Sequence, residues 1–244
     1  SDVCSSDLNT VDMSERRLRE DYLPAYKAAV DSGCELVMTS FNTVDGIPAS
    51  GNKWLMRDVL REEWGFNGVI ISDYAAIQEL IAHGVAEDDR EAAKLGIEAG
   101  VDIDMKTPVY SNQLEGLVKD GVISEELIDE AVWRILNLKN KLGLFENPYR
   151  GANIDKEKEV ILSPEKRKLA RKISGESIVL LENNGVLPLS KDKKVAVIGP
   201  YGESRVLSGS WAINSNPKDV ITLMDAVKEK VSEENFTYAK GCEM

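Results

Sequence analysis

Residues 66–74 read Phe-Asn-Gly-Val-Ile-Ile-Ser-Asp-Tyr and contain the clearest strand signal of the chain. The run Val69–Ile71 is short, apolar and β-branched, which is typical of a buried parallel strand. Helical patterns precede and follow it. Asp73 comes at the carboxyl end of this strand, where functional residues collect in β/α folds. The alternative is that Ser72 or Asp73 caps the next helix, since both residue types are favoured at that position.

Strand-like and helical patterns alternate through the first part of the chain. Strands are expected at 35–42, 69–73 and 101–105, and helices at 16–31, 52–64, 77–82, 90–99, 113–120 and 125–141. Ser14 and Ser124 are typical helix starts, and Gly33 and Gly100 typical helix ends. Residues 44–48 have turn chemistry. The alternation predicts parallel βα units and an α/β fold.

The pattern changes beyond residue 147. A connector at 156–190 contains a predicted helix at 165–176 and a strand-like segment, Ser177–Leu181. A second α/β region opens at Lys194–Pro200. Its Val-Ile-Gly-Pro segment lacks the glycine spacing of phosphate-binding loops, so we do not interpret it as one.

Composition limits the classes of function. The chain has 244 residues, a net charge of −12, 43% hydrophobic and 30% charged residues. The acidic balance argues against nucleic acid as a partner, and no apolar run approaches the roughly 18 residues of a membrane span. The three cysteines (Cys4, Cys34 and Cys242) lack metal-ligand spacing, and His83 is the single histidine. We therefore expect no metal and no cofactor, and chemistry based on carboxylates.

A longer stretch around Asp73 points to a family. Residues 52–73 read Asn-Lys-Trp-Leu-Met-Arg-Asp-Val-Leu-Arg-Glu-Glu-Trp-Gly-Phe-Asn-Gly-Val-Ile-Ile-Ser-Asp. This resembles the nucleophile region of glycoside hydrolase family 3, where Trp-Gly-Phe-x-Gly leads through a hydrophobic strand to Ser-Asp and an aromatic residue. The resemblance runs from Asn9 almost to the end, and the nearest branch is the bacterial periplasmic β-glucosidases. Ser1–Leu8 departs from it, and we expect an assembly scar there.

The resemblance implies an architecture with three parts. Residues 1–147 would form the C-terminal half of a (β/α)₈ TIM-type barrel, 148–190 a linker, and 191–244 the start of an α/β sandwich domain. A complete barrel needs eight strand–helix units, whereas three are recognisable here, so we expect an internal fragment. Unpaired strand edges template association, which predicts self-association of the chain.

The resemblance also implies an activity. The β-glucosidases of the family are retaining exo-acting enzymes that hydrolyse terminal β-D-glucosyl residues of β-glucosides or oligosaccharides, and Asp73 matches their nucleophile. Retaining enzymes need a second carboxyl group about 5–5.5 Å away. In many relatives it is a Glu of the second domain, beyond this chain, and no motif supports Glu79, Glu87 or Glu91. We therefore expect the chain alone to be inactive. The whole protein is expected in the periplasm or secreted, although no signal peptide begins this chain.

Several positions carry two interpretations. Met38 matches a family position that lines the sugar pocket, although Met is also a common core residue. Tyr74 falls where relatives place an aromatic beside the second sugar, and its alternative is plain packing. Phe41 replaces a Tyr that bonds the nucleophile in many relatives. Trp211 is equally suited to core packing or sugar contact. Asp102 and Asp104 are a weak metal signal, with solvation at a strand end as the preferred interpretation, and His83 is expected to be structural.

Other functions stay open. A β-xylosidase or another exo-β-glycosidase of the same family is the alternative within enzymes. A non-catalytic carbohydrate-binding remnant is a different class, against which the presence of Asp73 argues. A plain interaction domain does not account for the ordered resemblance.

Overall fold

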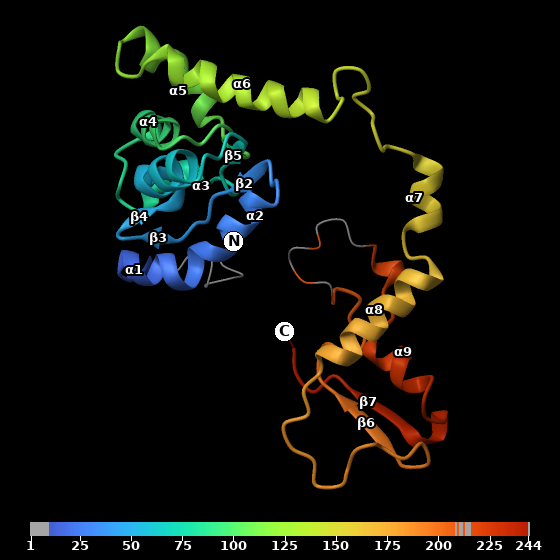
Figure 1. Cartoon of the computed structure of the whole chain (residues 1–244). Coiled ribbons are helices and arrows are strands. Elements are labelled where there is room, and N and C mark those ends of the chain that lie inside the picture. Colours follow the sequence, from blue (N-terminus) through green and yellow to red (C-terminus); the bar gives the residue numbers. More distant parts are fainter. Residues whose placement is uncertain (1–9, 208, 210–211, 213–215, 244) are drawn as a thin grey trace. The chain divides into compact units, whose positions relative to one another are not determined.

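A computed structural model describes residues 10–207, 209, 212 and 216–243 (Figure 1). The chain divides into two compact units, Ser1–Ala152 and Asn153–Met244. The predicted domain boundaries at 147 and 190 stay a prediction.

The first unit contains two small sheets and most of the helices. Its strands are β1 (Thr10–Val11), β2 (Leu36–Met38), β3 (Thr43–Val44), β4 (Ile47–Pro48) and β5 (Val69–Ile71). Its helices are α1 (Glu15–Arg17), η1 (Leu18–Tyr22), α2 (Leu23–Asp31), η2 (Ala49–Gly51), η3 (Trp54–Glu63), α3 (Ala76–Ala82), α4 (Asp89–Ala99), α5 (Val109–Lys119) and α6 (Glu125–Lys141).

The predicted parallel pairing around residue 70 is confirmed. β2 and β5 are parallel neighbours, with Leu36 opposite Val69 and Met38 opposite Ile71. The expected strand at 35–42 is shorter than predicted, because the ladder ends with the Thr39 amide donating to the Ile71 carbonyl at 2.9 Å.

The expected strand at 101–105 is reduced to a single parallel bridge between Ile71 and Ile103. At this position a carboxylate side chain accepts a hydrogen bond that a backbone carbonyl would accept in a regular ladder. The Ile70 amide donates to the Asp102 carboxylate at 2.8 Å, while the Asp102 amide donates to the Ile70 carbonyl, also at 2.8 Å. The segment therefore lies beside β5 without forming a regular ladder.

The second sheet has the order β1-β3-β4. β3 and β4 form an antiparallel hairpin, and β1 lies parallel to β3. The turn predicted at 44–48 is confirmed: Asp45 and Gly46 both have positive φ, 53° and 78°, as the tight turn of a two-residue hairpin requires.

Helix boundaries follow the capping residues. Ser14 accepts a hydrogen bond from the Arg17 amide at 3.3 Å, and Ser124 accepts one from the Glu126 amide at 3.2 Å. Gly100 ends α4 with a φ of 91°. These starts and ends confirm the prediction, although the helix expected at 16–31 is divided into α1, η1 and α2.

The core of the first unit lies between β5 and the helices that follow it. Its fully buried side chains include Ile70, Ile77, Leu80, Val101 and Leu117. Helix α4 approaches its neighbours closely because its inward residues are small. A Cβ at Gly96 would lie only 2.6 Å from the Tyr110 hydroxyl oxygen and 2.7 Å from Ile77 Cδ1.

The second unit contains α7 (Ile154–Val160), α8 (Pro164–Ser177), β6 (Val195–Ile198), η4 (Pro217–Asp219), α9 (Leu223–Lys228), η5 (Glu233–Asn235) and β7 (Phe236–Ala239). β6 and β7 are parallel, with Val195 opposite Phe236. The strand expected at Ser177–Leu181 is wrong: α8 extends to Ser177, and residues 178–181 are exposed with no strand assigned.

Candidate active site

Asp73 lies at the carboxyl end of β5, two residues beyond Ile71, and is partly buried. Met38 pairs with Ile71 across the sheet. Because residues directly opposite each other in a sheet point to the same side, Met38 and Ile71 belong to one face. The predicted parallel pairing of the two strands is confirmed, but both are shorter than predicted: β5 ends at Ile71, so Asp73 lies just beyond the strand and not on it. Phe41 lies three residues beyond β2 and is partly buried.

The capping interpretation of Ser72 and Asp73 is wrong. The residue before α3 is Ala75, in the left-handed region at φ 65°, and no side chain caps this helix. One Asp73 carboxylate oxygen accepts from the Tyr74 amide at 2.6 Å. The carboxylate therefore has no role in starting the helix, which leaves it available for chemistry.

Three buried hydroxyls, which we call the hydroxyl cluster (Thr39, Ser50 and Ser72), surround the backbone of Asp73. The Asp73 amide donates to Thr39 Oγ1 at 3.3 Å, and Thr39 Oγ1 lies 2.7 Å from Ser50 Oγ. Ser72 Oγ donates to the Asp73 carbonyl at 2.9 Å and accepts from the Met105 amide at 2.8 Å. The sequence interpretation missed Thr39 and Ser50. The available signal was a hydroxyl residue directly after each of two neighbouring strands.

Tyr74 is about half exposed, at 53%, so it is not a packed core aromatic. Lys106 Nζ lies 5.1 Å from the centroid of the ring, within cation–π range. Lys106 has a positive φ of 80°. Nothing in the sequence pattern pointed to Lys106, because it is 32 residues from Tyr74.

The preferred interpretation of Asp102, solvation at a strand end, is wrong. It belongs to a buried ionic cluster (Arg61, Asp102 and Arg134), in which its side chain is only 1% exposed. Arg61 Nη2 lies 2.6 Å from one carboxylate oxygen, and Arg134 Nη1 lies 3.1 Å from the other. Burial lowers the pKa of Arg61, against the opposing effect of the Asp102 charge.

The carboxylates of Asp102 and Asp104 are both engaged by other groups of the chain. Both Asp102 oxygens are occupied by cations, and Asp104 accepts from the Thr107 hydroxyl at 2.6 Å. Among the described residues no group of three or more His, Cys, Asp and Glu side chains is arranged to hold a metal ion.

Glu91, one of the other carboxylates near Asp73 in sequence, acts locally. Glu91 accepts from the Glu87 amide at 2.7 Å, at the start of α4. His83 follows the last residue of α3, and its amide donates to the Glu79 carbonyl at 3.0 Å. Trp211 and Cys4 lie outside the described residues.

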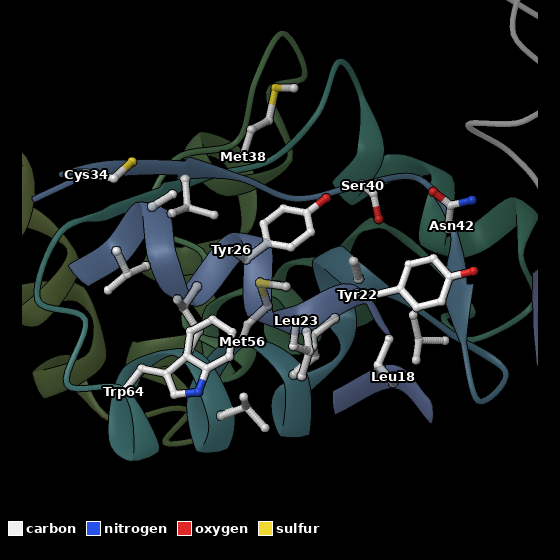
Figure 2. Close-up of a pocket in the computed structure, with 18 of the residues that line it drawn as sticks. Leu18, Tyr22, Leu23, Tyr26, Cys34, Met38, Ser40, Asn42, Met56 and Trp64 are labelled. Carbon is white, nitrogen blue, oxygen red and sulfur yellow. The ribbon is translucent and has the colours of Figure 1, made fainter. Parts of the chain in front are cut away.

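A cavity of about 490 Å³ lies between β2 and the helices η1, α2 and η3. Its lining is mainly apolar and includes Met38, Tyr22, Tyr26 and Trp64, but not Asp73. Figure 2 shows Met38 extending from the strand away from Met56 and Trp64. The cavity therefore lies on the helical side of β2, and we assign it no part in the chemistry of Asp73.

Comparison with known proteins gives two family matches. The model of the glycosyl hydrolase family 3 N-terminal domain matches residues 4–138, and that of the family 3 C-terminal domain matches residues 178–241. The first match lies in the first unit and the second in the second unit.

Individual relatives agree with these matches. The chain is 41% identical to a periplasmic β-glucosidase of Salmonella typhimurium, over 96% of this chain and 31% of the relative. It is 39% identical to a β-xylosidase of Formosa agariphila, over 96% of this chain and 34% of the relative. The crystal structure of a β-glucosidase from Listeria innocua in complex with glucose is 50% identical, with a TM-score of 0.82, and the match covers 95% of this chain and 32% of that one. The chain therefore spans about a third of the length of these relatives.

Proposed function

The chain belongs to glycosyl hydrolase family 3, and from that premise we propose that it is the nucleophile-bearing part of a retaining exo-acting β-glucosidase. The observation that carries the proposal is the position of Asp73. It lies at the carboxyl end of a parallel strand, its carboxylate does not cap a helix, and its backbone is fixed on both sides. The relatives named as β-glucosidases support glucosides as substrates.

In the proposed reaction the Asp73 carboxylate attacks the anomeric carbon of a terminal β-D-glucosyl residue. The glycosidic C–O bond breaks, and an acid elsewhere in the whole protein protonates the leaving oxygen. Water then attacks the glycosyl-aspartate, the same group removes the water's proton, and Asp73 leaves as a carboxylate. We assign the acid to no residue of this chain.

The proposed architecture is a piece of a (β/α)₈ barrel joined by a linker to the start of an α/β sandwich. The parallel pair β2–β5, the bridge to Ile103 and the helices after each strand support the barrel. The parallel pair β6–β7 supports the sandwich. We propose a periplasmic or secreted location, supported by the name of the Salmonella relative. No helix in the described ranges has the length and apolarity to cross a membrane.

Self-association through strand edges is part of the proposal. β2 exposes Leu36 (45%) and Met38 (51%), which are large apolar side chains on one strand. Sedimentation velocity of the 244-residue chain should give species larger than a monomer, and Leu36→Lys should reduce them. A single monomeric species for the unchanged chain would contradict this.

The central experiment replaces Asp73 in a full-length protein that contains this sequence. Asp73→Ala should lower kcat by several orders of magnitude, because the covalent route is lost. A 2-fluoro glucoside should label Asp73, as identified by mass spectrometry. Glu79→Gln is the matched control, and it should keep its activity. Labelling of another carboxylate would contradict the assignment.

A β-xylosidase is the second candidate, favoured by the Formosa relative. The comparison of kcat/KM for an aryl β-glucoside and the matching β-xyloside decides between them. A higher value for the xyloside would replace glucose with xylose in the proposal and leave the role of Asp73 unchanged.

A further inference from the structure

Resting on the proposed function of Asp73, we propose that the hydroxyl cluster acts as a set of positioning residues for the nucleophile, with Thr39 as its central member. Thr39, Ser50 and Ser72 are 1%, 0% and 0% exposed. They come from three separate places in the chain, namely the end of β2, helix η2 and the end of β5. All three lie within one or two hydrogen bonds of the Asp73 peptide groups.

The amide side of Asp73 depends on Thr39. Its hydroxyl accepts from the Asp73 amide at 3.3 Å and lies 2.7 Å from the Ser50 hydroxyl, to which it can donate its own proton. Thr39 is itself fixed to β5, because its amide donates to the Ile71 carbonyl at 2.9 Å. Thr39 therefore connects β2 and η2 to the backbone amide of Asp73 through hydrogen bonds.

The carbonyl side depends on Ser72. Its hydroxyl donates to the Asp73 carbonyl at 2.9 Å and accepts from the Met105 amide at 2.8 Å. The same carbonyl accepts from the Ala76 amide at 3.1 Å. With both peptide groups bonded, the direction of the Cα–Cβ bond of Asp73 is fixed, and only the side-chain torsions remain free.

Such fixation matters because the chain leaves the strand abruptly at this point. Ala75 has a φ of 65°, a conformation that non-glycine residues adopt only where surrounding contacts hold it. Attack on an anomeric carbon requires the carboxylate oxygen to be placed closely, and a displacement of about 1 Å can cost a hundredfold in rate. The hydroxyl cluster supplies contacts on both sides of the nucleophile.

The test uses Thr39→Val in a full-length protein that contains this sequence. A 2-fluoro glucoside with a dinitrophenyl leaving group reports the attack of Asp73 alone, since this leaving group needs no protonation. We expect the maximal labelling rate to fall by about 10- to 100-fold. The half-saturating concentration should change by less than about twofold, because substrate binding is not altered. Thr39→Ser, which keeps the hydroxyl, should restore most of the rate.

Thr43→Val is the matched control. Thr43 is also a buried threonine, at 8% exposed, but its hydroxyl has no hydrogen-bond partner within the described part of the chain. It should label at the unchanged rate. An unchanged rate in Thr39→Val, or no recovery in Thr39→Ser, would overturn the positioning role.

Two further variants, Ser50→Ala and Asp73→Ala, cover a Thr39→Val protein that does not fold and distinguish the two proposals. If Thr39→Val does not fold, Ser50→Ala takes its place: a labelling rate lowered about threefold or more at unchanged half-saturation supports the role of the cluster, and an unchanged rate overturns it. Asp73→Ala separates the two proposals. If it is labelled elsewhere at the normal rate, the proposed function fails. If it is not labelled but Thr39→Val is unaffected, only the positioning role fails.

Discussion

The hydroxyl of Thr43 lowers the free energy of unfolding of the chain. It is buried in β3, and no described group forms a hydrogen bond with it. Leaving a buried polar group unpaired costs about 1–3 kcal/mol. Thr43→Val removes the hydroxyl and keeps a β-branched side chain, so we expect the free energy of unfolding to rise by about 1 kcal/mol in urea denaturation.

Thr39→Val should change the free energy of unfolding in the opposite direction to Thr43→Val. Its hydroxyl is bonded to the Asp73 amide and to Ser50, so its removal should lower the free energy of unfolding by about 1–3 kcal/mol. Equal effects of the two substitutions would show that hydrogen bonding of these hydroxyls does not determine their contribution.

At the residue scale the sequence predicts Asp73 as the nucleophile candidate but does not predict its surroundings. Asp73 was predicted because it follows a recognisable strand, a feature of adjacent residues. Thr39 and Lys106 lie 34 and 33 residues away from it, and spacing along the chain does not reveal which distant loops meet. Asp102 was misinterpreted because its partners, Arg61 and Arg134, come from helices before and after it.

The buried ionic cluster connects three elements, η3, the segment beside β5 and α6. Removing one member of a buried pair leaves the other charge without compensation and costs about 3–5 kcal/mol. We expect Asp102→Ala to lower the free energy of unfolding by that amount. Hydrogen exchange at the Ile70 amide should also become faster, because this amide loses its carboxylate acceptor.

Glu130→Gln is the control for this prediction. Glu130 also pairs with Arg134, at 2.9 Å, but its side chain is 45% exposed. Exposed ion pairs contribute about 0–1 kcal/mol, so this variant should be nearly as stable as the unchanged protein. A loss as large as that of Asp102→Ala would show that burial does not set the cost.

Elements with local signals were predicted well, and those that depend on partners were not. Helix α6 begins and ends where Ser124 and its amphipathic pattern indicate. Residues 177–181 were interpreted as a strand from their apolar, β-branched composition, yet a strand also needs a neighbour to accept its hydrogen bonds. Among the described residues none pairs with 178–181.

At the scale of the whole molecule, the nucleophile candidate lies outside the cavity that described residues of β2 and its neighbouring helices line. Asp73 is only partly buried, and it does not line the 490 Å³ cavity on the helical side of β2. We therefore expect the 244-residue chain alone to hydrolyse no glucoside. A dinitrophenyl glucoside should give no burst of dinitrophenol in stopped-flow absorbance, even though its leaving group needs no acid. A stoichiometric burst that disappears in Asp73→Ala would contradict this.

The mixed α/β class and the parallel pairing of β2 with β5 followed from the alternation of patterns, which depends on neighbouring residues. The barrel itself stays a proposal, because closure depends on strands that must meet across the whole ring. The chain spans about a third of its relatives' length, so most of those contacts are not among its residues.

The exposed segment after α8 has a consequence for handling the protein. Residues 178–194 contain no helix or strand, and Ile178, Val179, Leu180 and Leu181 are 77%, 75%, 61% and 92% exposed. A protease must bind an extended stretch of backbone, and such segments are its preferred sites. Brief digestion with thermolysin, which cuts on the amino side of Ile, Leu and Val, should therefore cut first within residues 178–181, ahead of buried sites such as Leu80 and Leu117. Mass spectrometry would then find two complementary fragments, and the larger would carry Asp73.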